Sequence, residues 1–152
     1  MSKNIEIERK FLVKDESYKQ LSVRRYEIKQ GYLCKESGRT IRIRIRDNEA
    51  FITIKGASAN NGLSHFEWEK AIDTEDAEQL LNLALPGIIE KTRWIIPAEN
   101  GALKWEVDEF HGRLDGLTIA EIELEDENQT FDKPAFIAQE VTGRKEYYNS
   151  NL

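Results

Sequence analysis

The chain has 152 residues, of which 22 are Lys or Arg and 28 are Asp or Glu, so its formal net charge is −6. This length suits one compact domain over residues 1–152, and a hydrophobic content of 39% supplies enough apolar side chains for a core. The acidic balance argues against extended nucleic acid as a partner, because such binding draws its affinity from a net basic surface.

Cysteine usage and hydropathy indicate the compartment. The single cysteine, Cys34, excludes an intramolecular disulfide and favours a reducing environment. The first residues contain no apolar signal region, and nowhere do about eighteen apolar residues follow one another, as a membrane helix requires. We therefore expect a soluble, cytoplasmic protein that does not act at a membrane.

The residue patterns predict mostly strands and few helices. The first half is predicted to contain a strand at 5–13, a short helical stretch at Glu16–Ser22, strands at Tyr26–Leu33, Thr40–Arg46 and Phe51–Lys55, and a loop at Gly56–Ser64. The second half is predicted to contain strands at His65–Ile72, Ile88–Ile96, Leu103–Glu109 and Leu117–Glu125, and a helix at about Glu75–Leu85. The tail, Asp132–Leu152, is predicted to be helical in parts and to cover an open end or edge.

The order of one strand, one helix and three strands occurs twice, and each opening strand carries a Glu-x-Glu pair. This repetition indicates a weak internal duplication. It predicts an α+β fold, an eight-stranded antiparallel β-barrel built from a duplicated β-α-β-β-β unit, with flanking helices and a C-terminal helical segment. A closed barrel removes exposed strand edges and can enclose a small ligand.

Charged residues share one face of most predicted strands. In the first strand Glu6, Glu8 and Lys10 alternate with bulkier, mostly apolar neighbours, so all three line one side. The same parity in later strands collects Arg42, Arg44, Arg46, Lys55, Glu67, Glu69, Lys91, Arg93, Lys104, Glu106, Asp108, Glu121, Glu123 and Glu125. The opposite faces are apolar and include Ile41, Ile43, Trp68 and Trp94.

Two arrangements explain this separation. The charged faces could meet water, as in ordinary half-buried sheets, or they could line a tunnel while the apolar faces pack beneath helices. The strict segregation favours the tunnel, because a solvated face normally mixes charges with Ser, Thr, Asn and Gln. Like charges two residues apart repel, and a polyphosphate bound with a divalent metal supplies both missing counter-charges. The chain has no Gly-rich phosphate loop.

These motifs resemble those of the CYTH superfamily, also called triphosphate tunnel metalloenzymes. Glu6-x-Glu8-x-Lys10 matches the opening signature of that family. Further matches follow in the family's order over nearly the whole chain, at Ile41–Arg44, Thr53–Gly56, Glu67–Glu69, Lys91–Arg93, Trp105–Asp108, Ala120–Glu125 and Glu140–Thr142. The resemblance implies a metal-dependent enzyme that cleaves a terminal phosphoanhydride by attack of water, without a covalent enzyme intermediate.

The resemblance also implies roles for individual residues. The phosphate-binding residues would be Lys10, Arg42, Arg44, Lys55, Lys91 and Arg93. The ligands of Mg²⁺ or Mn²⁺ would be Glu6, Glu8, Glu121 and Glu123. Lys91 and Tyr32 are the nearest matches to a pair that activates water, and Glu69 is counted with them as catalytic. Glu67 and Asp108 would support the metal or orient the basic residues.

The motifs are compatible with more than one activity. The leading hypothesis is hydrolysis of inorganic tripolyphosphate or another small triphosphate, and thiamine triphosphate is an alternative substrate. Adenylate cyclisation uses the same tunnel but needs a purine pocket, and Glu36–Thr40 offers no aromatic residue or histidine for one. A non-catalytic polyphosphate-binding or nucleotide-binding module is a further alternative. Acids in the pocket disfavour it, because pure anion binding gains nothing from them.

The two histidines are not expected to bind a metal. His65 and His111 lie in or beside predicted loops and share no ligand spacing, so we expect surface histidines. The sequence does not predict the oligomeric state.

Overall fold

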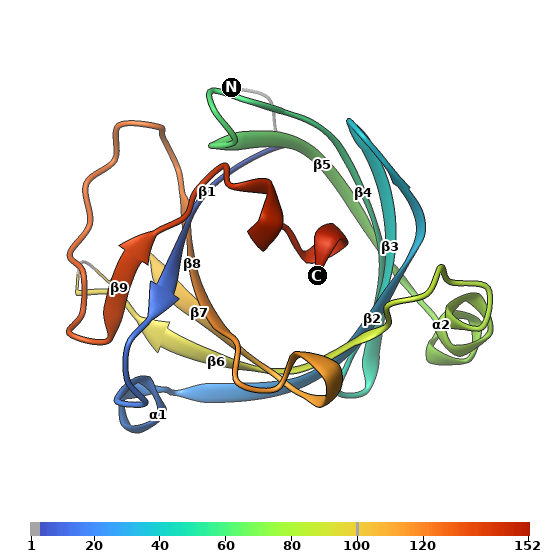
Figure 1. The fold of residues 1–152 in the computed structure, drawn as a ribbon, viewed down its shortest axis with the longest axis horizontal. Helices are drawn as coiled ribbons and strands as arrows, with labels where there is room; N and C mark the ends of the chain where they lie inside the picture. The colour runs from blue at the N-terminus through green and yellow to red at the C-terminus, as the bar shows by residue number, and fades with distance from the viewer. Residues whose placement is uncertain (1–3, 100) are drawn as a thin grey trace.

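The computed structural model describes residues 4–99 and 101–152, and its described strands form one antiparallel sheet (Figure 1). The strands are β1 (Ile5–Val13), β2 (Arg24–Glu36), β3 (Arg39–Arg46), β4 (Glu49–Ala59), β5 (Ser64–Ile72), β6 (Ile89–Pro97), β7 (Lys104–Phe110), β8 (Thr118–Leu124) and β9 (Ile137–Glu140). The helices are α1 (Tyr18–Leu21), α2 (Thr74–Leu81) and the 3₁₀ turns η1 (Gly112–Leu114), η2 (Lys145–Tyr147) and η3 (Asn149–Asn151).

The first eight strands close into a barrel. The order along the sheet is β5-β4-β3-β2-β6-β7-β8-β1, and β1 also pairs with β5 to complete the ring. Strand β1 achieves this because Ile5–Ile7 pair with β5, whereas Ile7–Leu12 pair with β8 on its other edge. The predicted eight-stranded antiparallel barrel is therefore confirmed.

The topology repeats the duplication predicted from the sequence. The first unit is β1-α1-β2-β3-β4 and the second is β5-α2-β6-β7-β8. The two units meet through like strands, because β1 pairs with β5 and β2 pairs with β6. Each opening strand also pairs with the last strand of the other unit, β1 with β8 and β5 with β4. The barrel is thus assembled from two equivalent halves.

The structure extends β4 and β5 into the predicted loop Gly56–Ser64. Pairing between Ser58 and His65 continues the ladder, and the remaining turn is made by Asn60, Asn61 and Gly62, all with positive φ. The prediction was wrong because it relied on the weak strand propensity of small polar residues. Cross-strand pairing overrides such local preferences.

Helix α2 is shorter than predicted, because it ends at Leu81 rather than at about Leu85. The proline after Leu85 disfavours helical backbone there, and the Leu85 amide instead donates to the carbonyl of Tyr32 in β2 at 2.8 Å. Close approach is possible because β2 carries Gly31, where a Cβ would lie 2.5 Å from Cδ1 of Ile88. The helix terminus is therefore held against the outside of the barrel.

The tail also differs from its prediction. Part of it forms β9, which pairs with the end of β1 through Phe11 and Val13 and lies outside the ring (Figure 1). Its helical parts are the short turns η2 and η3, which lie within the outline of the barrel in Figure 1. The tail thus covers a strand edge and also reaches the opening of the tunnel.

Two of the apolar clusters lie on the outside of the barrel wall, whereas a smaller one around Phe110 and Ile119 shares the inner face of β6 to β8 with Lys91. The largest packs Phe11, Trp105 and Ile122 against Tyr18 of α1 and against Phe136, and another packs Ile43 and Ala50 of the barrel under Ala77 and Leu81 of α2. Helices α1 and α2 accordingly lie outside the ring (Figure 1).

One of the predicted outward-facing residues lacks cover. Trp94 contacts Tyr18 edge to face with ring centroids 6.1 Å apart, and Ile43 is fully buried. Trp68 was expected to pack beneath a helix, but it is 38% exposed, because neither helix extends over β5. Within the described residues, the structure contains no helix long and apolar enough to cross a membrane.

The position of the core makes a test of stability possible. Trp105→Ala should lower the free energy of unfolding by about 3 to 5 kcal/mol, because Trp105 is fully buried in the largest apolar cluster. Trp68→Ala should lower it by less than about 1 kcal/mol, because Trp68 lies on the uncovered outer face. Urea unfolding of both variants measures the difference, and equal losses would contradict this placement of the core.

Candidate active site

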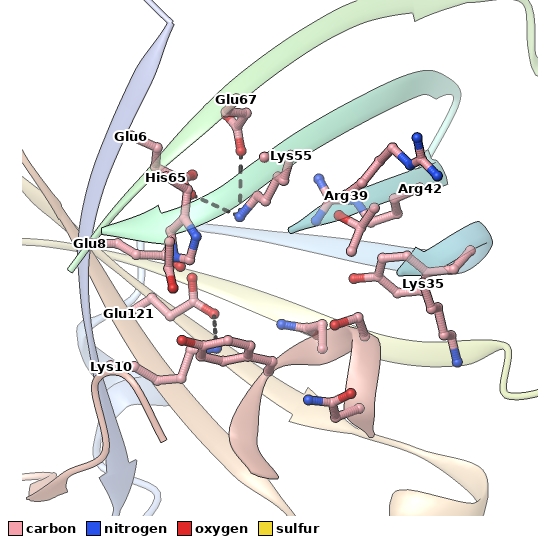
Figure 2. Close-up of a pocket in the computed structure, with 18 of the residues that line it drawn as sticks. Glu6, Glu8, Lys10, Lys35, Arg39, Arg42, Lys55, His65, Glu67 and Glu121 are labelled. Carbon is pink, nitrogen blue, oxygen red and sulfur yellow. Dashed lines mark hydrogen bonds and ion pairs between the residues drawn. The ribbon is translucent and has the colours of Figure 1, made fainter. Parts of the chain in front are cut away.

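The inside of the barrel holds a cavity of about 790 Å³. Figure 2 shows acidic and basic side chains from several strands pointing into it. Twelve of the fourteen residues that the sequence assigned to the site line this cavity: Glu6, Glu8, Lys10, Tyr32, Arg42, Arg44, Lys55, Glu67, Glu69, Arg93, Glu121 and Glu123. The other two, Lys91 and Asp108, are buried on the inner face of β6 and β7 but do not line the cavity.

Strand register explains why these side chains meet. Residues directly opposite on antiparallel strands point to the same face of the sheet. In β1 and β8, Glu8 lies opposite Glu123 and Lys10 lies opposite Glu121. The single parity seen in the sequence therefore becomes one shared inner surface.

Carboxylates from β1 and β8 form an acidic cluster on this surface. Burial and the nearby charge of Glu121 raise the pKa of Glu8 well above its ordinary value. Burial opposes ionisation of Glu121 too, but the ammonium of Lys10, 3.7 Å away, and a hydrogen bond from Glu8 lower its pKa to about 2. The charge of each carboxyl group therefore affects the ionisation of the other, and a bound cation would relieve their repulsion.

This cluster suits a hard divalent cation in its chemistry, because carboxylate oxygens are the ligands that Mg²⁺ and Mn²⁺ prefer. It is not arranged as a finished site, since no three acidic, His or Cys side chains of the described residues already surround a metal position. Glu6, for example, is engaged with Lys55 at 2.8 Å. A metal would have to draw these carboxylates away from their present partners.

Lys55 of β4 joins two acids across the cavity. Its Nζ lies 2.8 Å from Glu6 and 3.5 Å from Glu67, as the dashed lines in Figure 2 show. Burial disfavours the charged ammonium, but Glu8 and Glu6 outweigh it and raise the pKa of Lys55. Burial and the charge of Glu6 raise the pKa of Glu67 to about 7.

The arginines of β3 are oriented by uncharged neighbours that the sequence reasoning missed. Arg42 donates to Thr53 Oγ1 at 3.2 Å, and Thr53 in turn donates to Glu69 at 2.6 Å. Arg44 Nε donates to the side-chain oxygen of the fully buried Gln30 at 3.3 Å. Both residues have the inward parity of their strands, which was the available signal, but only charged residues were collected by it.

Arg44 is a buried cation without a close carboxylate partner among the described residues. Burial, together with the charges of Arg42 and Arg93, lowers the pKa of Arg44 to about 9. Its guanidinium lines the cavity, and no carboxylate among the described residues forms an ion pair with it. An anion in the cavity would supply the missing negative charge.

Asp108 joins two buried cations in the wall. It accepts from Arg93 Nε at 2.7 Å and from Arg93 Nη2 at 2.8 Å, and its other contact is Lys91 Nζ at 2.7 Å. Burial opposes ionisation of Asp108, but these two cations outweigh it and hold its pKa well below the ordinary value. Burial lowers the pKa of Lys91 to about 7, despite the attraction of Asp108.

The suggested pair of Lys91 and Tyr32 is not in contact. Lys91 Nζ bonds to Asp108 and to the side chain of Asn149, and the structure shows no hydrogen bond between Lys91 and Tyr32 among the described residues. Tyr32 lines the cavity, opposite Arg42 in the register of β2 and β3.

The mouth of the cavity contains residues that the sequence did not assign. His65 lies opposite Glu6 and lines the cavity, so the expectation of a surface histidine was wrong. Its ring contacts that of Tyr148 edge to face at 6.1 Å. Burial and the charge of Lys55 lower the pKa of His65. Residues 37–39, at the turn from β2 into β3, also line the cavity.

A family model, the CYTH domain, matches residues 4–151 of the chain. The chain belongs to the CYTH family. The match covers all strands of the barrel and the tail, so the family assignment rests on the same elements that build the cavity.

Named relatives of this CYTH protein agree with one another. It is 42% identical to an inorganic triphosphatase of Acetivibrio thermocellus over 97% of its own length and 92% of the relative's. It is 35% identical to an inorganic triphosphatase of Nitrosomonas europaea, over 97% and 95% of the two chains. A crystal structure of an inorganic triphosphatase superimposes with a TM-score of 0.68 at 32% identity, covering 96% and 92% of the two chains.

The Asp108 cluster gives a prediction about stability. Asp108→Asn should lower the free energy of unfolding at pH 7 by about 3 kcal/mol, because it leaves Lys91 and Arg93 buried without their carboxylate. Glu106→Gln is the control and should cost about 1 kcal/mol or less, since Glu106 lies 3.4 Å from Arg93 and is 27% exposed.

The pH dependence follows from the direction of the shift. The folded pKa of Asp108 is depressed below its ordinary value of 3.8, so its contribution is complete above about pH 5 and declines as pH falls. The gap between wild type and Asp108→Asn in urea unfolding should therefore be smaller at pH 3 than at pH 7. A gap that widens on acidification, or no loss at pH 7, would contradict the assignment.

Proposed function

We propose that this protein is a metal-dependent triphosphatase that hydrolyses inorganic tripolyphosphate or a related small triphosphate. The observation that carries this is one cavity in which Lys10, Arg42, Arg44, Lys55 and Arg93 face a cluster of carboxylates. The cations match a short chain of phosphates, and the carboxylates match a divalent metal that accompanies it. The names of the two relatives support the same activity.

The basic residues would bind and neutralise the phosphates. Arg42 and Arg44 project neighbouring guanidinium groups from β3, and a guanidinium can donate two parallel hydrogen bonds to one phosphate. Arg93 is held at Asp108 and faces the same space. Phosphoryl transfer depends mainly on positioning and on charge stabilisation, which this arrangement supplies.

The metal ligands would be Glu6, Glu8, Glu121 and Glu123, with Glu67 and Asp108 in supporting positions. Their oxygens fit Mg²⁺ or Mn²⁺, which would supply charge neutralisation at the phosphates when bound. Burial and the charge of Glu121 raise the pKa of Glu8, so protonation of Glu8 would compete with metal binding. Metal affinity should therefore rise with pH.

Lys91, Tyr32 and Glu69 are our candidates for handling the proton of the attacking water. With a pKa of about 7, the amine of Lys91 is partly neutral at physiological pH and can accept a proton. Tyr32 and Glu69 line the cavity and can orient water by hydrogen bonds. In this structure Asn149 covers the ammonium of Lys91.

The central test is the set of products from three substrates. Purified protein is incubated with tripolyphosphate, ATP and thiamine triphosphate, each with Mg²⁺, Mn²⁺ or a chelator. We expect the highest kcat/KM with tripolyphosphate, orthophosphate as the product of any reaction with ATP, and no activity with the chelator.

Each alternative gives a different outcome of this test. Equal amounts of pyrophosphate and cyclic AMP from ATP would identify an adenylate cyclase. A higher kcat/KM with thiamine triphosphate would identify that substrate instead. Tight binding of tripolyphosphate without turnover under any condition would identify a binding module.

The carboxylates are tested by removing one charge at a time. Glu8→Gln and Glu123→Gln should each lower kcat at saturating Mg²⁺ by at least about 100-fold, because each removes a metal ligand but keeps its shape. Glu125→Gln is the matched control, since Glu125 is exposed and lies outside the cavity lining. Thermal unfolding of all three verifies that the fold persists. Near wild-type rates in Glu8→Gln or Glu123→Gln would refute the metal assignment.

A further inference from the structure

The C-terminal tail lies against the lysines of the proposed site. The tail residues Lys145, Tyr148, Asn149, Ser150 and Asn151 line the cavity. Lys10 Nζ donates to the main-chain oxygen of Tyr147 at 3.0 Å, and Lys91 Nζ donates to Oδ1 of Asn149 at 3.0 Å. In Figure 1 the tail ends within the outline of the barrel.

Lys91 cannot reach the cavity past these contacts. Its side chain is 0% exposed, and its ammonium is enclosed by Asp108 at 2.7 Å, Asn149 at 3.0 Å and the ring of Phe110 at 5.3 Å. Asn149 lines the cavity, whereas Lys91 does not appear in its lining among the described residues. The amide of Asn149 therefore separates the lysine from any bound ligand.

An amide oxygen and a phosphate oxygen can each accept an N–H hydrogen bond from an ammonium group. A phosphate oxygen can therefore replace the amide oxygen at a lysine. Asp108 belongs to a strand of the barrel, whereas Asn149 belongs to a single 3₁₀ turn near the chain end. We propose that Asn149 is a positioning residue that occupies Lys91 in the free protein and yields it to a phosphate oxygen of the substrate. This inference rests on the proposed function.

The residues just before η2 show how the position of the chain end is set. Gly143 has a φ of +77°, and a Cβ there would lie 2.1 Å from the main-chain oxygen of Asn61. The turn between β4 and β5 thus seats the tail on the barrel. On its other side, the tail is held by Tyr147 and Leu152, which pack against the apolar cluster of Ile89, Phe110 and Ile119.

The first experiment measures access to Lys91 without any substrate. An amine-reactive reagent is applied, and modification of each lysine is followed by peptide mass spectrometry, with the exposed Lys70 as internal reference. Lys91 should react at least about tenfold more slowly than Lys70 in the wild type. Asn149→Ala should speed the reaction of Lys91 at least about fivefold and leave Lys70 unchanged.

Three further variants make the result specific. Ser150→Ala, the neighbouring cavity residue, should leave the reactivity of Lys91 unchanged. Asn149→Asp should slow it further, because a carboxylate holds the ammonium more strongly than an amide does. Gly143→Ala should reproduce the effect of Asn149→Ala by displacing the start of the tail, and it provides the test if Asn149→Ala fails to fold.

Kinetic measurements distinguish whether Asn149 competes with the substrate for Lys91 or holds Lys91 in its working position. If Asn149 competes with substrate for Lys91, Asn149→Ala should lower the KM for tripolyphosphate about threefold or more without lowering kcat. Unchanged labelling of Lys91 in both Asn149→Ala and Gly143→Ala would overturn the proposal. A fall in kcat at constant KM would also overturn it, since Asn149 would then hold Lys91 in its working position.

A final arm distinguishes this proposal from the proposed function. Tripolyphosphate added without a divalent metal should slow the labelling of Lys91 in Asn149→Ala, because phosphate takes the place of the amide. Faster labelling in the variant, but without protection by tripolyphosphate, would refute the exchange with substrate while leaving the cover by Asn149 in place. Absence of turnover in the wild type would refute the triphosphatase and not the cover.

Discussion

Charge compensation inside the barrel is the constraint on which the rest of the structure depends. Cations and carboxylates that share the inner surface are expensive to bury unless each finds a partner. The structure meets this demand with Asp108 between Lys91 and Arg93, and with Lys55 between Glu6 and Glu67. Two positions are left incompletely matched: the Glu8 and Glu121 pair has an excess of negative charge, and Arg44 an excess of positive charge.

These two residual imbalances define the ligand in chemical terms. A cation near Glu8 and an anion near Arg44 would each relieve one of them, and a metal triphosphate complex carries both charges in one molecule. Under the function proposed above, the cavity would therefore be complementary to such a complex rather than to a free anion or a free metal. The tail provides a temporary substitute, because oxygens of Tyr147 and Asn149 satisfy Lys10 and Lys91 when no phosphate does.

A charged interior also dictates the exterior. Because the inner faces are polar, the apolar faces of the strands point outward and need cover, which α1, α2 and the segment around Phe136 provide. This inverts the usual relation between a sheet and its core. It also explains why Trp68, on the face of β5 that no helix reaches, stays partly exposed.

Most of the fold and much of the site could be predicted from the sequence, because strand parity is a strictly local property. Alternation alone placed Glu8, Arg44 and Glu121 on one face, and closure of the barrel then brought their strands together. The sequence did not reveal β9, the extension of β4 or the place of His65, because these depend on pairing between distant segments. Asn149 was beyond reach for the same reason, since 58 residues separate it from Lys91.

The most direct test of the central claim is a crystal structure with tripolyphosphate and Mn²⁺, in which anomalous scattering locates the metal. Our account predicts a Mn²⁺ peak bound by carboxylates of β1 and β8, with phosphate oxygens within hydrogen-bonding distance of Arg42 and Arg44. It also predicts that Lys91 has exchanged Asn149 for phosphate. Tripolyphosphate bound on the outer surface, or Mn²⁺ away from Glu8 and Glu121, would contradict the account.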